Sequence, residues 1–212
     1  MITIIITVLG FVIFIYSIIL HEIAHGLAAE HLGDPTAKLS GRLTLNPLPH
    51  IDPFMSILVP LFLAFSGFPI IIGAAKPVPI DPYNLRSPRK DMGFIGLAGP
   101  ATNLVLAILF ALTARIVPTS FGLTQLLANV CLLNLVLAIF NLIPVPPFDG
   151  GRVMIAILPR QYAKVLASLE NFGTLIFLFL LLFPNPLFSL PGIIFGSASA
   201  IFRLIFPSSP LV

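Results

Sequence analysis

Residues 19–26 read Ile-Leu-His-Glu-Ile-Ala-His-Gly and close the first apolar run of the chain, which starts at Met1. On a helix, His21 and His25 lie four residues apart and share one face, so both imidazoles can bind one Zn²⁺. The neighbouring Glu22 can reach a water molecule on such a metal. We interpret this stretch as a zinc site on a helix. The alternative is a pair of core histidines with Glu22 turned toward a polar loop.

The motif follows a segment that could cross a membrane. Residues 3–20 are eighteen uncharged residues, which is the length of a membrane-spanning helix. A charged side chain at membrane depth costs about 2.5–3.5 kcal/mol on insertion scales, so titratable residues there indicate a functional site. Because the zinc motif, and no small-residue cleavage site, follows the apolar run, we expect a retained helix and no removed signal peptide.

The composition is typical of an integral membrane protein. Hydrophobic residues make up 58 % of the 212 residues and charged residues only 9 %, far from the balance of a soluble domain. The length allows a single membrane domain over residues 1–212, with a motif-bearing core at 1–152 and C-terminal helices at 153–212. The basic residues behind the net charge of +3 lie in short loops between apolar runs, which argues against a nucleic-acid partner. Cys131 is the single cysteine, so no intrachain disulfide can form.

The apolar runs predict an all-α integral membrane fold with about five or six transmembrane helices. The runs lie at residues 2–28, 92–114, 121–143, 165–183 and 187–206. Residues 54–75 are also apolar, but Pro60, Gly67 and Pro69 break them, which favours a re-entrant segment. Residues 36–50 alternate polar and apolar side chains, which favours a short β-hairpin after the first helix.

Loop charges favour one topology. If every apolar stretch crossed the membrane, His25 and Asp149 would lie at opposite faces. If residues 54–75 enter and leave on one side, nine of the eleven lysines and arginines gather on the face of the zinc motif. The positive-inside rule then places the N-terminus outside and the metal site toward the cytoplasmic side.

A zinc hydrolase site needs a third protein ligand beside His21 and His25. Asp149 is preferred because it follows a predicted span, lies among prolines and glycines, and shares the charge-assigned face of His25. It could also be a turn residue, since Asp-Gly is common in turns. His31 stands at the third histidine position of the metzincin pattern, but Ala28 replaces the required glycine, so we interpret His31 as a surface loop residue.

Several short motifs are shared with a known family. They are His-Glu-Ile-Ala-His at 21–25, Asn-Pro-Leu-Pro-His-Ile-Asp-Pro at 46–53, Ala-Lys-Pro-Val-Pro at 75–79, Gly-Pro-Ala-Thr-Asn at 99–103, and Asn-Leu-Ile-Pro-Val-Pro-Pro-Phe-Asp-Gly-Gly-Arg at 141–152. With them the chain resembles the site-2 protease family of intramembrane zinc metalloproteases. The family's usual Leu-Asp-Gly reads Phe148-Asp149-Gly150 here. Without the PDZ or CBS domains of some members, the chain looks like a minimal member.

The resemblance implies one Zn²⁺ per chain, with His21, His25 and Asp149 as ligands and Glu22 as the catalytic acid/base. It implies a metalloendopeptidase in a lipid bilayer, which we expect to be a prokaryotic cell membrane. Its substrates would be membrane proteins, cut within or near a transmembrane helix. We expect such substrates to carry helix-weakening Gly, Pro or Asn near the cut, because a helix must unwind before attack.

Other roles and functions stay open at this stage. Asn103 and Asn141 lie in apolar spans and could hold an oxyanion or position the substrate, or could bond between helices. His50 has no assigned role. The chain could also be an inactive zinc-binding homologue that binds membrane proteins, or a metal transporter. The intact Glu22 argues against the former, and the missing inverted repeats argue against the latter.

Overall fold

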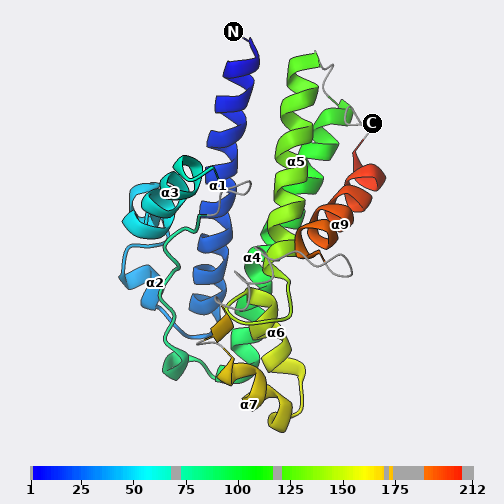
Figure 1. Ribbon diagram of the computed structural model, residues 1–212. Coiled ribbons are helices and arrows are strands. Elements are labelled where there is room, and N and C mark those ends of the chain that lie inside the picture. The colour runs from blue at the N-terminus through cyan, green and yellow to red at the C-terminus, as the bar shows by residue number, and fades with distance from the viewer. Residues whose placement is uncertain (1, 68–72, 117–120, 170–171, 174–188, 207–212) are drawn as a thin grey trace.

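The computed structural model describes residues 2–67, 73–116, 121–169, 172–173 and 189–206. Over that part the chain is helical and has no strand, as the sequence predicts for an all-α protein (Figure 1). The elements are α1 Ile2–Leu32, α2 Thr36–Leu39, η1 Leu48–His50, η2 Pro53–Leu58, α3 Val59–Phe65, η3 Pro82–Asn84, α4 Pro88–Ile116, α5 Phe121–Asn141, α6 Asp149–Ile157, α7 Arg160–Ser168 and α9 Leu190–Ile205.

Three helices of the described part are long and apolar enough to cross a membrane. The candidate spans are Thr3–Leu32, Pro88–Ile116 and Gly122–Asn141. These helices, α1, α4 and α5, run along the long axis of the molecule, with α6 and α7 at the end opposite the N-terminus (Figure 1). Exposed side chains such as Ile4 and Phe11 suit contact with lipid chains.

Two of these helices extend beyond their predicted ends. α1 continues past residue 28 to Leu32. The next residue, Gly33, has a φ of 114°, a backbone angle that residues other than glycine rarely adopt, and the helix stops there. α4 begins at Pro88 and not at residue 92, because the Asp91 carboxylate accepts a 2.7 Å hydrogen bond from the Ser87 amide. The bond pairs the backbone amide just before the helix with a carboxylate, and a negative charge in the first turn also stabilises this end of a helix.

The predicted hairpin at residues 36–50 is wrong. The segment forms α2, turns and η1, with local backbone bonds from the Ser40 amide to the Thr36 carbonyl and from the Arg42 amide to the Ala37 carbonyl, both 3.0 Å. These bonds satisfy the backbone within the segment, so it needs no neighbouring strand. The alternation of side chains was therefore a misleading signal.

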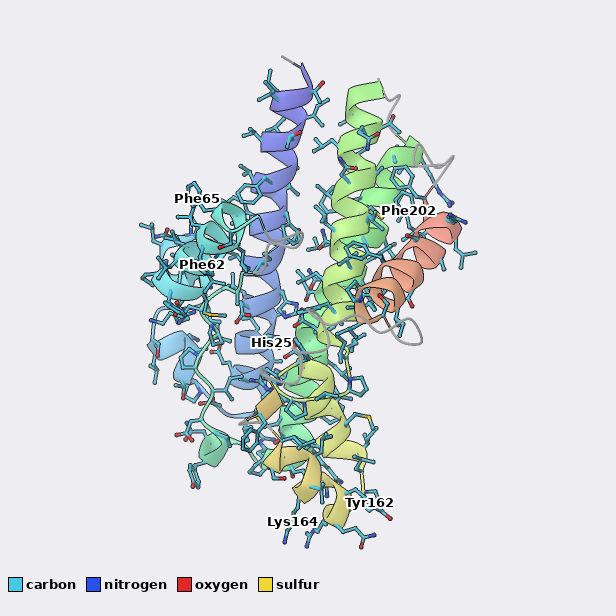
Figure 2. All side chains as sticks on the ribbon, viewed as in Figure 1. His25, Phe62, Phe65, Tyr162, Lys164 and Phe202 are labelled. Carbon is cyan, nitrogen blue, oxygen red and sulfur yellow. The ribbon has the colours of Figure 1, made fainter. Side chains whose placement is uncertain are left out.

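The apolar segment 54–75 begins and ends at the same place. It forms η2 and α3, and the described residues after it return to its start. The Ala74 amide donates to the Met55 carbonyl at 3.1 Å, and the Lys76 amide donates to the His50 carbonyl at 2.9 Å. Phe62 and Phe65 of α3 are exposed and project outward (Figure 2).

The chain after this segment is bound to the end of α1 by a buried carboxylate. Asp34 accepts hydrogen bonds from the Asp81 amide at 2.8 Å and from Asn84 Nδ2 at 2.9 Å. Burial alone would raise the pKa of Asp34, but hydrogen bonds from Thr36, Asn84 and the Asp81 amide lower it below its usual value. An ionised Asp34 thus holds residues 81–84 against the end of the helix that carries the zinc motif.

The helices α4, α5 and α9 pack together through small residues. α4, α5 and α9 share a core in which Ala107, Ala128 and Ala198 are fully buried, together with Phe202. Small side chains let apolar helices approach closely. α9 covers most of the last predicted stretch. Most of the predicted helix 165–183 lies outside the described residues.

Candidate metal centre

Three predicted ligands meet at one point. His21 Nε2 lies 3.1 Å from His25 Nε2, and Asp149 Oδ2 lies 3.2 Å from each of them. All three residues are buried, and His25 lies in the interior among α1, α4 and α6 (Figure 2). In the described part of the chain these residues form the one cluster that could hold a metal ion.

The distances between these three ligand atoms fit a bound Zn²⁺. In tetrahedral coordination with bonds of about 2.0–2.1 Å, ligand atoms lie about 3.3 Å apart. The observed sides of 3.1, 3.2 and 3.2 Å are close to that value. Two imidazoles and one carboxylate are also a donor set typical of catalytic zinc sites, which leave a fourth position for water or substrate.

The outer nitrogens of both histidines are already bonded. His21 Nδ1 lies 2.6 Å from Asn103 Oδ1, and His25 Nδ1 lies 2.7 Å from the Ile95 carbonyl. Since both partners are oxygen acceptors, each Nδ1 donates a proton and each Nε2 keeps its lone pair. Metal-binding histidines usually have such a partner, which orients the ring.

Asp149 reaches the histidines because two glycines allow close packing. It is the first residue of α6, and a Cβ on the following Gly150 would lie 2.3 Å from the Leu142 carbonyl oxygen. A Cβ on Gly96 of α4 would lie 2.9 Å from the Asp149 carbonyl oxygen. Arg152 Nη1 is 3.7 Å from Asp149 Oδ1, so its charge lies beside the oxygen that faces away from the histidines.

Gly99 leaves room for the ligand atoms, and its replacement provides a test. A Cβ there would lie 2.5 Å from His25 Nε2 and 2.6 Å from His21 Nε2, both too short for any real contact. We therefore expect Gly99→Ala to weaken zinc affinity at least about tenfold, the scale reached when ligands lose their orientation. Competition with a chromophoric chelator measures this. The control is Gly196→Ala in α9, where a Cβ meets nothing within 4 Å. Equal affinities for Gly99→Ala and the control would contradict the geometry.

Glu22 shares a cavity with the three ligands. The cavity has a volume of about 140 Å³, and its walls are formed by His21, Glu22, His25, Pro77, Val78, Ile80, Asn141, Pro147, Asp149 and Arg152. The Val78 amide donates to Glu22 Oε2 at 3.0 Å. One oxygen of this carboxylate is thus held by the backbone, which orients the other. The arrangement can support proton transfer next to a metal.

The other predicted residues lie in different places. Asn141 lines the cavity, whereas Asn103 is fully buried between helices and bonds to His21 and Asn134. His31 is exposed and lies outside the cluster. His50 is buried, and its Nε2 contacts the Thr44 carbonyl, so it belongs to loop packing.

Sequence reasoning missed three features near the site. Asn134 is a polar residue in an apolar span, the same signal that singled out Asn103 and Asn141, and could have been found with it. The glycines at 93, 96 and 99 recur every third residue and indicate a helix face that neighbours approach closely. The Val78 contact was missed, although Val78 lies in the shared motif at 75–79 and is the one residue of Pro77-Val78-Pro79 that has an amide hydrogen.

Comparisons with known proteins agree with this chemistry. Residues 117–184 match the model of peptidase family M50. A Bacillus subtilis protein named "Putative zinc metalloprotease YwhC" is 37 % identical over 80 % of this chain and 78 % of its own length. "Putative zinc metalloprotease Rip2" of Mycobacterium tuberculosis is 31 % identical over 89 % of this chain and 70 % of its own. "Zinc metalloprotease MJ0392" of Methanocaldococcus jannaschii is 28 % identical over 82 % of this chain and 42 % of its own length. No solved structure matches the chain significantly.

Proposed function

Because the chain belongs to peptidase family M50, the site-2 protease family of intramembrane zinc metalloproteases, we propose that its buried cluster is the active site of a metalloendopeptidase. His21, His25 and Asp149 hold one Zn²⁺ per chain, and Glu22 is the catalytic acid/base. The observation that carries the proposal is the triangle of ligand atoms with sides of 3.1–3.2 Å, in the same cavity as Glu22.

The residues around the proposed metal site have different roles in peptide hydrolysis. When bound, zinc would act as a Lewis acid, which lowers the pKa of a water ligand toward about 7 and polarises the scissile carbonyl. Glu22 takes a proton from the attacking water on its carboxylate and returns it to the leaving amine. The Val78 amide keeps Glu22 aimed into the cavity through the bond to Oε2. Asn141 lines the cavity, and its Nδ2 donates one hydrogen to the Leu137 carbonyl at 2.9 Å, so its second hydrogen is the neutral donor that it can offer to the substrate carbonyl.

The substrates are membrane proteins with a transmembrane helix. A cavity of about 140 Å³ admits a short unwound piece of chain but no intact helix, whose diameter is about 10–12 Å. Helix-weakening residues near the cut would therefore favour cleavage. The test is cleavage of a single-span reporter by the purified protein in detergent, with zinc content measured in the same samples. A zinc-loaded protein that cuts none of several reporters, including ones with Gly, Pro or Asn in the span, would refute the proposed activity.

We further propose that the active site faces the cytoplasmic side of a prokaryotic cell membrane. Residues 54–75 form a re-entrant segment, which the Ala74–Met55 and Lys76–His50 bonds between its ends support. Together with the three candidate spans, α9 and the helix predicted at residues 165–183 would make five transmembrane helices beside this re-entrant segment. The loops that hold nine of the eleven basic residues then share the cytoplasmic face.

Cysteine labelling tests this topology. In a Cys131→Ser background, single cysteines at the exposed positions Lys38 and Arg86 should react with an impermeant maleimide only from the cytoplasmic side. A cysteine at the exposed Arg115, at the far end of α4, should react only from the other side. Labelling of Lys38→Cys and Arg86→Cys from opposite faces would show that residues 54–75 cross the membrane.

A further inference from the structure

Four polar side chains from the three candidate spans form one buried hydrogen-bonded chain, here called the relay: Ser17, Asn134, Asn103 and His21. Each has at most 4 % of its surface exposed. Asn134 Nδ2 donates to Ser17 Oγ at 3.1 Å, and Asn103 Nδ2 donates to Asn134 Oδ1 at 3.0 Å. Asn103 Oδ1 lies 2.6 Å from His21 Nδ1, so the relay ends on a proposed metal ligand.

Two backbone carbonyls determine the direction of every bond in the relay. Asn134 Nδ2 lies 2.8 Å from the Val130 carbonyl, and Ser17 Oγ lies 3.0 Å from the Ile13 carbonyl. A carbonyl oxygen only accepts hydrogen bonds. Asn134 must therefore turn its NH₂ group toward Val130 and Ser17, which leaves its oxygen facing Asn103.

The orientation of the Asn134 amide determines the orientation of Asn103 and, through it, the tautomer of His21. Since Asn134 presents an oxygen, Asn103 must turn its NH₂ group toward Asn134 and its own oxygen toward His21. That oxygen can only accept, so His21 carries its proton on Nδ1. Nε2, the atom that faces His25 and Asp149, then keeps the lone pair that a metal needs.

The two histidines differ in how their protonation is held. His25 Nδ1 donates straight to the Ile95 carbonyl, which cannot reverse. His21 depends on an amide group, and an amide can rotate by half a turn to exchange its donor and acceptor ends. If Asn103 were reversed, its NH₂ group would face Nδ1, and a neutral His21 would carry its proton on Nε2.

We propose that Asn134 is a positioning residue that fixes the orientation of the Asn103 amide and, through it, the metal-binding tautomer of His21. The inference rests on the proposed metal site. Asn134 touches neither substrate nor metal, and its influence reaches the site through Asn103. The relay also ties α1, α4 and α5 together at the depth of the site.

The tautomer of His21 can be measured by NMR in the metal-free protein. The chain has four histidines, so ¹⁵N-histidine labelling gives few NMR signals, and His31→Gln and His50→Gln assign the two that lie outside the site. In the metal-free protein, at a pH where imidazoles are neutral, His21 should carry its proton on Nδ1. Asn134→Leu should give a mixture of both tautomers and about tenfold weaker zinc binding, within the range known for outer partners of metal ligands.

Two further variants separate this role from a structural one. Asn129→Leu lies on the same helix, and Asn129 accepts its hydrogen bond from Gln125 of that helix, so the variant should behave as wild type. Asn134→Asp keeps an oxygen toward Asn103 in either protonation state and should retain the Nδ1 tautomer. A wild-type His21 protonated only on Nε2 would overturn the proposal, whether or not Asn134→Leu folds. So would an Asn134→Leu protein with wild-type tautomer and affinity.

The outcomes for the relay and for the proposed function are distinct. If wild-type protein shows the Nδ1 tautomer and Asn134→Leu loses it, but neither binds zinc, the relay stands and the metal site fails. If wild-type protein binds zinc and cleaves the reporter, but Asn134→Leu changes nothing, the function stands and the relay fails.

Discussion

Replacing Glu22 by glutamine is expected to lower the cleavage rate of a single-span reporter by about 10²–10⁴-fold, the usual contribution of a general acid or base. Glutamine has nearly the same shape and keeps an oxygen that can accept from the Val78 amide. It cannot take a proton from water. Because Glu22 is not one of the three clustered ligands, zinc content should stay at one per chain.

Measuring zinc and cleavage on the same preparation makes this result decisive. Loss of cleavage with zinc retained supports an acid/base role, whereas loss of both would indicate that Glu22 supports the metal site or the fold. Cleavage by Glu22→Gln within a few-fold of wild type would remove the residue from the mechanism.

Replacing Asp149 by alanine is expected to abolish both zinc binding and cleavage. Asp149 Oδ2 lies 3.2 Å from each histidine Nε2 and is the carboxylate oxygen of the cluster. Its loss leaves two imidazoles, too few for a catalytic zinc site. We expect zinc affinity to fall more than about 100-fold, the upper range for outer partners that do not touch the metal.

Elemental analysis after dialysis against a chelator gives the zinc stoichiometry. A useful control is Asp52→Asn, since Asp52 caps η2 and lies outside the cavity. It should keep full zinc content. Retention of one zinc per chain by Asp149→Ala would mean that another residue supplies the third ligand, and it would refute the assignment of Asp149.

Much of the site could be predicted from the sequence because its chemistry depends on local spacing. His21 and His25 are one helical turn apart, so helix geometry alone brings their rings together. Asp149 lies far along the chain; its place after a predicted span among prolines and glycines, the charges of the loops and a family resemblance pointed to it. Spacing cannot show that the Asn103 side chain turns toward His21 and away from the cavity, because both orientations suit an asparagine in an apolar span.

The fold was predicted best where one physical effect, the hydrophobicity of the segment, decides the structure. Hydrophobicity alone places the long spans, since lipid tolerates few other structures. Prediction failed at residues 36–50, where alternating side chains resemble a strand but the backbone bonds locally in α2. It also missed the first turn of α4, where Asp91 caps a helix that hydrophobicity does not reveal.

The most direct test of the central claim is the position of the metal in the purified wild-type protein. Crystals grown with zinc, and measured on both sides of the zinc absorption edge, should show one anomalous peak per chain. We expect that peak about 2.0–2.2 Å from His21 Nε2, His25 Nε2 and an oxygen of Asp149. A zinc peak on the two histidines with the Asp149 carboxylate turned away, or a peak elsewhere in the chain, would contradict it.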